Sequence, residues 1–249
     1  MKRVKLVVVY DGTNYCGWQV QKNGETIESV LNRAIGELTG EEIHVMGSSR
    51  TDAGVHACGN VAVFDTEARM AADKFSYALN QRLPEDIRIQ DSCEVPADFH
   101  PRFQKTVKTY EYRILNREFP LPAYRFNSHF TYRKLDVERM RQAAAYLIGE
   151  HDFQSFCAAG AQVKTTVRTI YALDVEKQGD LIILRITGNG FLYNMVRIIA
   201  GTLMKIGQGD WEPERIPEIL AGCDRQLAGP TAPARGLTLM EIHFKGEKG

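Results

Sequence analysis

A short polar segment at residues 47–57, with the sequence GSSRTDAGVHA, combines residue types that could do chemistry. A connection between two strands normally needs only turn residues, yet this one presents Arg50, Thr51, Asp52 and His56 together. In one interpretation the segment is an ordinary turn, in which the Asp52 side chain accepts a hydrogen bond from a nearby backbone N–H. In the other, Asp52 is a nucleophile or base with a cation two residues away. The spacing alone leaves both interpretations open.

A second candidate is Arg197, the one charged residue within the apolar segment 191–201. A helix that is apolar on most sides is buried on most sides, and an unpaired guanidinium there would be costly. We therefore expect a carboxylate partner, although a side chain that reaches the surface, or a pair with a structural acid, would also satisfy the charge. If the partner is Asp52, the cation would keep that carboxylate ionised and hold its conformation.

The third candidate is a basic and aromatic run over residues 100–117. Its cations are Arg102, Lys105, Lys108, Arg113 and Arg117, and its aromatic residues are Phe103, Tyr110 and Tyr112. Basic side chains position phosphates, and aromatic rings stack on unpaired bases, which contributes about 1–3 kcal/mol per base. An amphipathic strand with a solvated edge would show the same pattern. Arg50, Lys164 and Arg168 add positive charge elsewhere, so we favour contact with RNA.

Several functional classes lack their sequence signals. No P-loop is present, and residues 188–190 lack the third glycine of a dinucleotide-binding loop. The five cysteines are scattered without a Cys-x-x-Cys pair, which predicts neither disulfides nor a zinc site and favours a reducing, cytoplasmic setting. The apolar stretch 191–206 is too short to span a bilayer, so we expect a soluble protein without membrane contact. We expect no metal, nicotinamide or other small-molecule cofactor.

The formal charges balance, because Lys and Arg together number 31, as do Asp and Glu. A purely electrostatic nucleic-acid binder would carry an excess of cations. Any basic surface must therefore be local.

The order of strands and helices follows from hydrophobic periodicity. The first half shows strands at residues 4–10, 43–48, 61–64 and 87–95 and helices at 27–38 and 72–81, which is the order β-α-β-β-α-β. Thr26 and Gly40 are typical of the two ends of the first helix. The second half approximates the same order, with strands at 107–115, 167–176, 181–187 and 239–244 and helices at 137–148 and 192–206. Asp136 and Gly149 are the expected ends of helix 137–148.

These patterns predict an α+β fold of two ferredoxin-like halves, residues 1–104 and 105–249, with mostly antiparallel sheets. The first half carries the polar loop at residues 47–57, and the second carries the basic run and the segment with Arg197. Two such sheets side by side would leave a cleft between them, which is a common location for a site.

With these motifs in place, the chain resembles the tRNA pseudouridine synthase A family. The segment RTDAGVHA at residues 50–57 closely resembles the signature of that family. Further matches cover nearly the whole chain, in order: YDG at 10–12, GWQ at 17–19, FHPR at 99–102, KTYEY at 108–112, HDFQSF at 151–156, GFLYNMVR at 190–197 and TAPARGL at 231–237. Two positions depart from the pattern: Ser49, where the family often has Gly, and Tyr15, where it often has Phe. The serine bears on the backbone conformation of the loop and not on its chemistry.

The resemblance implies an isomerase in which Asp52 is the catalytic nucleophile and Arg197 pairs with its carboxylate. It also implies that Tyr110 packs at the target base, and Arg50 is expected to contact the substrate. The family works as a cytoplasmic homodimer without cofactor and converts uridines at about positions 38, 39 and 40 of the tRNA anticodon stem-loop to pseudouridine. The target base must leave its stack, which costs about a few kcal/mol.

Two other classes of function remain as alternatives. A non-catalytic RNA-binding protein would keep the basic and aromatic run without needing Asp52 beside Arg197. A carboxylate-dependent nucleoside hydrolase would release free uracil instead of keeping it in the RNA. Analysis of nucleosides by chromatographic retention separates these readings, because pseudouridine and uridine have the same mass.

Overall fold

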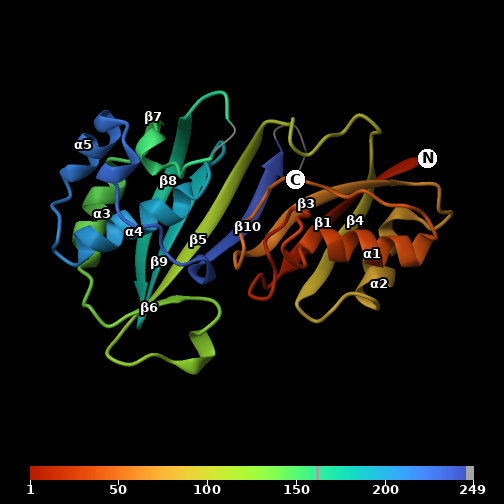
Figure 1. Cartoon of the computed structure of the whole chain (residues 1–249), viewed down its shortest axis with the longest axis horizontal. Coiled ribbons are helices and arrows are strands. Elements are labelled where there is room, and N and C mark those ends of the chain that lie inside the picture. The colour runs from red at the N-terminus through yellow and green to blue at the C-terminus, as the bar shows by residue number, and fades with distance from the viewer. Residues whose placement is uncertain (161–162, 245–249) are drawn as a thin grey trace. The chain divides into compact units, whose positions relative to one another are not determined.

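The computed structural model describes residues 1–160 and 163–244, which form two compact units (Figure 1). Unit 1 comprises Met1–Lys105 together with the chain from Leu239 onward, and unit 2 is Thr106–Thr238. The last strand, expected in the second half, thus groups with unit 1. Both units mix strands and helices, as expected for the α+β class.

Unit 1 contains the elements of the split β-α-β-β-α-β motif in the predicted order. They are β1 (Lys2–Tyr10), α1 (Ile27–Thr39), β2 (Met46–Gly47), β3 (His56–Thr66), η1 (Ala72–Lys74), α2 (Phe75–Asn80) and β4 (Ile87–Val95). The strands pair antiparallel in the order β4-β1-β3, and β2 also pairs with β3. The final strand, β10 (Leu237–Phe244), lies next to β3.

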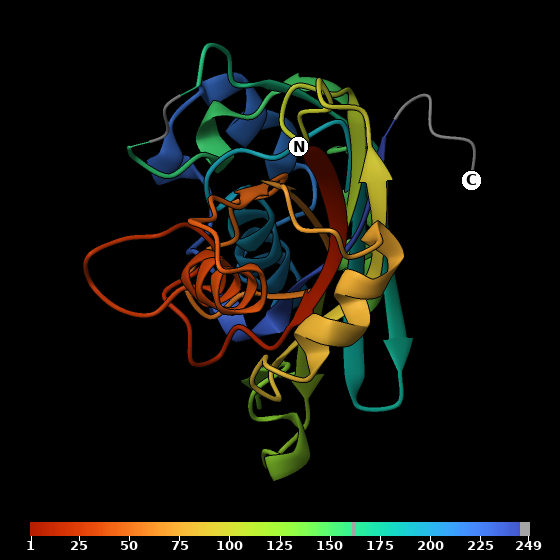
Figure 2. The ribbon, with the colours of Figure 1, turned by 90° about the vertical axis from the view of Figure 1, so that its right-hand side faces the viewer.

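The core of unit 1 follows from two sequence periods. Every second residue of β1 is buried, and every fourth residue along one face of α1 is buried, as the strand and helix geometries require. The side chains removed from water in this way are Val4, Leu6 and Val8 on the strand and Ile27, Leu31 and Ile35 on the helix. In Figure 2, α1 is seen nearly along its axis beside β1, and the loop between β1 and α1 projects past it.

Unit 2 has more elements than its sequence pattern predicts. Its strands are β5 (Thr106–Asn116), β6 (His129–Thr131), β7 (Gly149–Asp152), β8 (Val167–Gln178) and β9 (Leu181–Gly188), and its helices are α3 (Val137–Ala145), α4 (Met195–Gly207) and α5 (Arg215–Gly222). Short 3-10 turns lie at η2 (Pro122–Tyr124), η3 (Gln154–Phe156), η4 (Arg225–Leu227) and η5 (Ala234–Gly236). The strands pair antiparallel in the order β5-β9-β8-β7, and β6 pairs parallel with β5.

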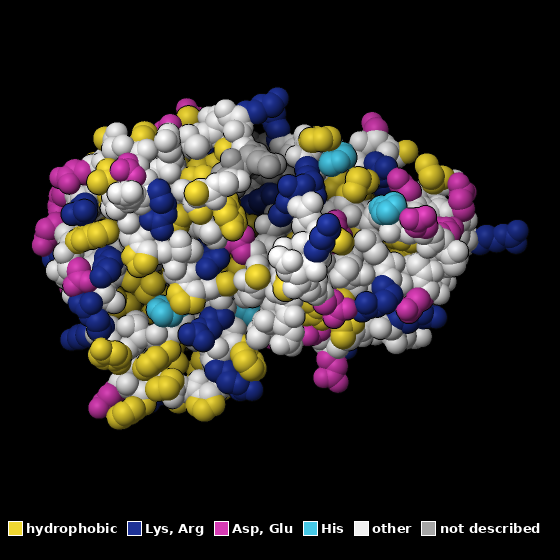
Figure 3. Space-filling view, in the orientation of Figure 1, with side chains coloured by type: hydrophobic (Ala, Val, Ile, Leu, Met, Phe, Trp, Pro, Cys, Tyr) yellow, Lys and Arg dark blue, Asp and Glu magenta, His cyan; other side chains and the backbone are white. Residues whose placement is uncertain are grey.

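Helices α3 and α4 pack on each other, with α3 also against β8 and α4 against β5. Between β5 and α3, the segment that contains β6 exposes Phe119, Phe126 and Tyr132. Hydrophobic side chains gather over this segment in Figure 3. None of the helices among the described residues is long and apolar enough to cross a membrane.

The helix ends show which sequence signals were decisive. Thr26 caps α1 through a hydrogen bond from the Ser29 N–H, and Gly40 ends α1 with a left-handed φ of 74°, both as predicted. Asp136 accepts hydrogen bonds from two backbone N–H groups and caps α3 as predicted. Gly149 does not end α3, however, because the helix stops at Ala145 and Gly149 begins β7.

Other elements also differ from their predicted bounds; the strand expected at residues 61–64, for example, is longer and is β3 (His56–Thr66). The strand expected at residues 43–48 is reduced to β2, and the helix expected at 72–81 divides into η1 and α2. The helix expected from residue 192 begins only at Met195. The chain enters it through Gly190 with a φ of 156° and Asn194 with a φ of 60°, neither of which is helical backbone.

A buried polar network fixes the start of the loop that joins β2 to β3. The Asn60 side chain, 0% exposed, accepts a hydrogen bond from the Ser49 N–H at 3.3 Å and donates to the Ser49 carbonyl oxygen at 3.1 Å. It also donates to the Tyr10 hydroxyl at 3.3 Å, and that hydroxyl shares a 2.7 Å hydrogen bond with the Thr51 hydroxyl. Residues 49 and 51 are therefore tied to β1 and β3.

We predict that Asn60→Ala loosens this loop and destabilises the protein. Buried donors and acceptors that lose their partner cost about 1–3 kcal/mol each, so the free energy of unfolding should fall by about 2–4 kcal/mol. Urea unfolding followed by circular dichroism measures the loss, and hydrogen exchange at the Ser49 amide should become faster. Asn23→Ala, at an exposed asparagine of the same unit, is the matched control and should change stability by less than about 0.5 kcal/mol. Equal effects of the two substitutions would contradict the assignment.

Candidate active site

Asp52 lies in the loop at residues 48–55, between β2 and β3. Its side chain is half-buried, whereas Thr51 on one side is buried and Arg50 is exposed. The network described above holds the backbone of Ser49 and the side chain of Thr51, so the loop is an anchored connection and not a simple solvated turn. A carboxylate on such a loop is held in place without being removed from the solvent.

The connection between β1 and α1 is hydrogen-bonded to the loop that carries Asp52. The backbone N–H of Trp18 donates to the Thr51 carbonyl oxygen at 3.0 Å, and the backbone N–H of Gly54 donates to the Tyr15 carbonyl oxygen at 3.3 Å. Gly17 has a φ of +86°, and a Cβ there would lie 2.7 Å from the Thr51 carbonyl oxygen. The approach of the two backbones therefore requires glycine at this position.

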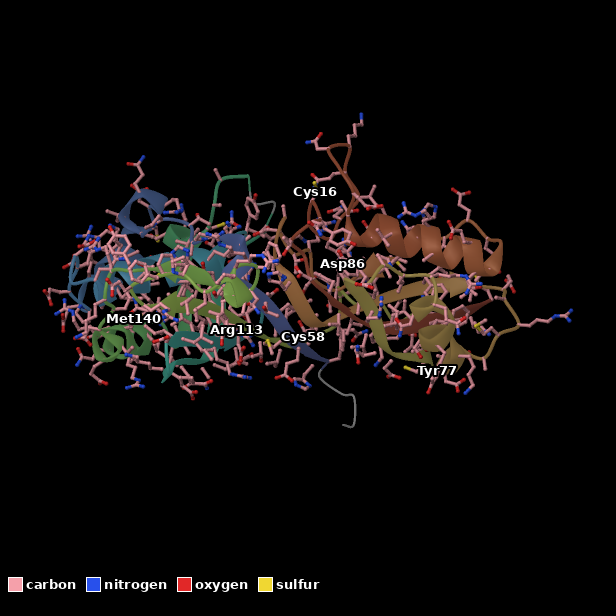
Figure 4. The ribbon with its side chains drawn as sticks, turned by 90° about the horizontal axis from the view of Figure 1, so that it is seen from below. Cys16, Cys58, Tyr77, Asp86, Arg113 and Met140 are labelled. Atoms are coloured by element: carbon pink, nitrogen blue, oxygen red, sulfur yellow. The ribbon has the colours of Figure 1, made fainter. Side chains whose placement is uncertain are left out.

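Asp86, labelled in Figure 4, makes two hydrogen bonds to the connection between β1 and α1. Its carboxylate accepts a 2.6 Å hydrogen bond from the Tyr15 hydroxyl, and its carbonyl oxygen accepts a 2.9 Å hydrogen bond from the Asp11 N–H. Burial and the carboxylate raise the pKa of the Tyr15 hydroxyl, which keeps it a hydrogen-bond donor. The motifs at residues 10–12 and 17–19 thus frame the Asp52 loop.

His56 follows Asp52 by four residues and is buried. Its Nδ1 accepts a hydrogen bond from the Gly12 N–H at 3.1 Å and lies 3.0 Å from an Asp11 carboxylate oxygen. The Gly12 contact requires Nδ1 without a hydrogen and a hydrogen bond to Asp11 requires Nδ1 with one, so the two contacts are alternatives for the same nitrogen. Burial opposes ionisation of Asp11, but hydrogen bonds from Thr13 and the neighbouring His56 outweigh it, so the pKa of Asp11 is lowered.

Arg197 lies on the first turn of α4 and is half-buried. Its Nε donates to the Ala232 carbonyl oxygen at 2.7 Å, and its Nη1 donates to Asn194 Oδ1 at 2.8 Å. The Ala232 N–H in turn donates to the Arg197 carbonyl oxygen at 3.1 Å. The motif at residues 231–237 therefore orients this guanidinium from within unit 2.

Tyr110 and Tyr112 lie on the same face of β5, but they have different environments. Tyr110 is half-buried and packs edge-to-face on Phe191, with ring centroids 5.2 Å apart and an interplanar angle of 84°. Tyr112 is 0% exposed, and its hydroxyl donates to the Pro233 carbonyl oxygen at 2.9 Å. Burial raises the pKa of this hydroxyl. Tyr112 is therefore a core residue and not one that stacks on a base, whereas the role of Tyr110 stays a prediction.

Two cations of the basic run are committed to ion pairs within unit 2. Arg113, labelled in Figure 4, lies 3.1 Å from an oxygen of the buried Glu111 carboxylate, whose other oxygen pairs with Arg185. Arg117 lies 3.4 Å from the Asp180 carboxylate. Each of these two cations thus has an acidic neighbour within unit 2, whereas contact of the whole run with RNA stays a prediction.

The segment at residues 99–105 retains exposed positive and aromatic groups in unit 1. Phe103 is 84% exposed, and its ring stacks on that of His100 at a centroid distance of 4.0 Å and an angle of 21°. Arg102 donates through Nε to the Gly47 carbonyl oxygen at 3.0 Å. Burial and the nearby charge of Arg50 lower the pKa of Arg102, which indicates that the two guanidinium groups lie close together.

The remaining basic candidates lie in unit 2, before β8 and at its start. Lys164 is exposed, and Arg168 is half-buried, with Nη1 donating to the Thr165 and Val167 carbonyl oxygens at 2.9 and 2.6 Å. Within residues 1–160 and 163–244, no group of three or more His, Cys, Asp or Glu side chains is placed to hold a metal ion.

The predicted site residues therefore belong to two groups. Asp52 and Arg50 belong to unit 1, whereas Tyr110 and Arg197 belong to unit 2. The expected pair of Asp52 and Arg197 joins residues of different units and stays a prediction. Sequence reasoning missed Asn60 and Asn194, whose polar side chains support the two groups. Both could have been noticed in the sequence, because each is a polar residue inside an otherwise apolar segment and therefore needs a hydrogen-bond partner.

The chain matches a family model described as tRNA pseudouridine synthase over residues 6–104 and 143–245. It is 48% identical to the tRNA pseudouridine synthase A of Acetivibrio thermocellus, over 98% of this chain and 100% of that protein. The proteins of the same name from Ruminiclostridium cellulolyticum and Brevibacillus brevis are 49% and 50% identical, with the same coverage. A solved Cbf5-Nop10-Gar1 complex has a TM-score of 0.36 at 12% identity, over 95% of this chain and 47% of that one, a likeness too loose to carry an argument.

The motifs that frame Asp52 in unit 1 and Arg197 in unit 2 lie within the span of these relatives, which are alike along the whole chain. The chain therefore belongs to the tRNA pseudouridine synthase A family.

Proposed function

We propose that the protein isomerises uridines at about positions 38, 39 and 40 of the tRNA anticodon stem-loop, with Asp52 as the nucleophile and the target base turned out of its stack. As a member of its family the chain is an isomerase that converts uridine to pseudouridine in tRNA. The observation that carries the role of Asp52 is its place on a loop whose neighbouring residues are fixed by buried hydrogen bonds.

The reaction breaks the bond between the sugar carbon C1′ and N1 of uracil and forms a bond from C1′ to C5. C5 loses a proton and N1 gains one, so that no atom enters or leaves overall. A step of this kind needs no redox partner, but the detached base must be retained while it turns. The nucleophile must also be ionised and already in place when the base arrives.

Asp52 can act on the sugar in either of two ways. Its carboxylate can attack C1′ to give an ester-like intermediate, or it can accept a proton from the neighbouring carbon to give a glycal. Attack on C6 of the base is a third route. Each route uses a charged Asp52 held at a fixed place, which is what the network around Ser49 and Thr51 supplies.

Arg197 would keep Asp52 ionised during this chemistry. A guanidinium close to a carboxylate lowers the pKa of the acid and restricts its rotamers. The hydrogen bonds of Arg197 to Asn194 and Ala232 support this role, because they orient the cation through neutral oxygens. Tyr110, backed by Phe191, would stack on the everted uracil and offset part of the cost of turning it out.

The substrate's phosphates and unpaired bases would meet the exposed groups of unit 1. Arg50 and Arg102 form a local pair of cations, and the stacked rings of His100 and Phe103 offer a face on which a base could pack. This local arrangement fits a chain whose formal charges otherwise cancel.

We also propose that the protein works as a cytoplasmic homodimer, as the family resemblance implies. The exposed Phe119, Phe126 and Tyr132 support association, because clustered apolar surface is typical of protein contacts.

Loss of the Asp52 charge should abolish the reaction while leaving RNA binding intact. We predict that Asp52→Asn binds tRNA within about threefold of the wild-type affinity but gives no pseudouridine above background. Binding is measured by filter retention, and product by chromatography of digested tRNA. Asp91→Asn makes the same chemical change at an exposed aspartate of β4 and should leave both unchanged. Substantial turnover by Asp52→Asn would refute the nucleophile assignment.

The position of the modified uridine is tested with defined transcripts. A tRNA transcript with uridine at positions 38 to 40 should yield pseudouridine there, and replacing those uridines by cytidine should remove the product although uridines elsewhere remain. Mapping of the modified positions by reverse-transcription stops after carbodiimide treatment gives the readout. Pseudouridine formed elsewhere in the substituted transcript would reject the anticodon assignment, and free uracil would favour a hydrolase.

Contact with phosphates predicts a dependence of affinity on salt. The logarithm of the binding constant should fall linearly with the logarithm of salt concentration, and Arg50→Gln should reduce that slope by about one. Arg82→Gln serves as the control. Arg82 is an exposed arginine of unit 1 that follows α2 in the sequence, and its substitution should leave the slope unchanged. If wild-type affinity were independent of salt, the phosphate contacts would have to be abandoned.

A further inference from the structure

Asn194 occupies the N-cap position of α4 but does not cap it. At this position an asparagine side chain normally accepts a hydrogen bond from one of the first backbone N–H groups of the helix. Thr26 and Asp136 do so at α1 and α3, whereas the Asn194 side chain makes no such bond. Its oxygen instead accepts the 2.8 Å hydrogen bond from Arg197 Nη1.

The backbone of Asn194 adopts a conformation that few residues tolerate. Its φ of 60° and ψ of 8° lie in the left-handed region, and among the described residues only Asn194 and Cys223 do so without being glycine. Asparagine is one of the side chains that accept this conformation at modest cost. The turn places its carboxamide beside a residue one helical turn later, and because Arg197 can only donate, the carboxamide oxygen must face it.

Two hydrogen bonds on different edges define the plane of the Arg197 guanidinium. The Ala232 carbonyl oxygen binds Nε, and the Asn194 oxygen binds Nη1. A planar group held at two of its nitrogens cannot rotate about its long axis without breaking a bond. Since both acceptors are neutral, the orientation is gained without cancelling the positive charge.

We propose that Asn194 is a positioning residue for the isomerisation, acting through Arg197. Its carboxamide oxygen holds the guanidinium in the orientation in which its charge stabilises the ionised nucleophile. This inference rests on the proposed role of Arg197 and extends it to a residue that touches neither the substrate nor the reacting atoms.

The experiment uses the full chain with a tRNA transcript and measures kcat and KM separately. Asn194→Gly removes the side chain and keeps a residue that adopts left-handed backbone readily, so the turn should survive. We expect kcat to fall about tenfold to a hundredfold, as for the loss of a hydrogen bond to a charged group, with KM changed by less than about threefold. Asn194→Asp keeps an oxygen acceptor in place, so its kcat should lie between those of the glycine variant and the wild type.

A double-mutant cycle tests whether the effect passes through Arg197. Arg197→Met alone should lower kcat strongly, and adding Asn194→Gly to it should change kcat by less than about twofold, because the group to be positioned is already gone. Cys223→Gly places glycine at the other left-handed position, at the end of α5, and should leave kcat unchanged. Thermal unfolding of each variant reports on folding.

The outcomes separate the inference from the function on which it rests. If Arg197→Met slows the reaction but Asn194→Gly does not, the inference is overturned while the role of Arg197 stands. If Asn194→Gly is equally damaging with and without Arg197, Asn194 acts by another route and the inference is again overturned. If Arg197→Met leaves kcat unchanged, both fail together. Should the glycine variant unfold at a lower temperature, the double-mutant cycle decides: an equal fall in kcat with and without Arg197 contradicts positioning by the oxygen.

Discussion

The buried carboxamide of Asn60 is the constraint on which the candidate site of unit 1 depends. It satisfies both backbone polar groups of Ser49 and binds the Tyr10 hydroxyl, which in turn meets Thr51. Asn60 is 0% exposed and its partners are buried, so a bond lost here is not readily replaced by one to water. The start of the loop at residues 48–55 is therefore held by the fold itself, on either side of residue 50 and next to Asp52.

Unit 2 holds the side chain of Arg197, the residue proposed to support Asp52, in a related way. Arg197 is oriented by Asn194 and by the backbone of Ala232, just as Ser49 is oriented by Asn60. In both units an uncharged carboxamide makes the contact: Asn60 binds the Ser49 backbone, and Asn194 binds the Arg197 guanidinium itself. This choice matters because a charged partner would fix the geometry equally well but would change the charge that the chemistry uses.

The sequence was sufficient for elements whose signals are local. The alternation along β1, the cap at Thr26 and the glycine at position 40 are each decided within a few residues, and the structure has them as predicted. The polar loop around Asp52 was evident because its residue types are unusual for a turn. The whole-chain resemblance then gave the family, which the comparisons confirm.

What could not be predicted depends on contacts distant in sequence. Asn60 lies within an apolar strand, and nothing local shows that its partners are 50 residues away on β1 and 11 away in the loop. Tyr112 follows the same alternation as Tyr110, but the carbonyl oxygen of Pro233 draws its hydroxyl into the core. Helix α4 begins late because the backbone of Asn194 is left-handed. The spacing of apolar residues, from which the helix was predicted, contains no information on that turn.

The partners of each arginine separate structural cations from those available for function. Arg113 and Arg185 share the Glu111 carboxylate, and Arg117 lies next to Asp180, so each of the three has an acidic neighbour within unit 2. Arg102 and Arg197 make hydrogen bonds to carbonyl or carboxamide oxygens, which orient a guanidinium without neutralising it. In a chain with equal numbers of acidic and basic residues, such neutral acceptors hold a guanidinium in place and leave its charge for an anion, which for Arg197 is the proposed Asp52 carboxylate. The identity of the acceptor, more than the number of arginines, therefore decides where the protein can bind phosphate or stabilise an anion.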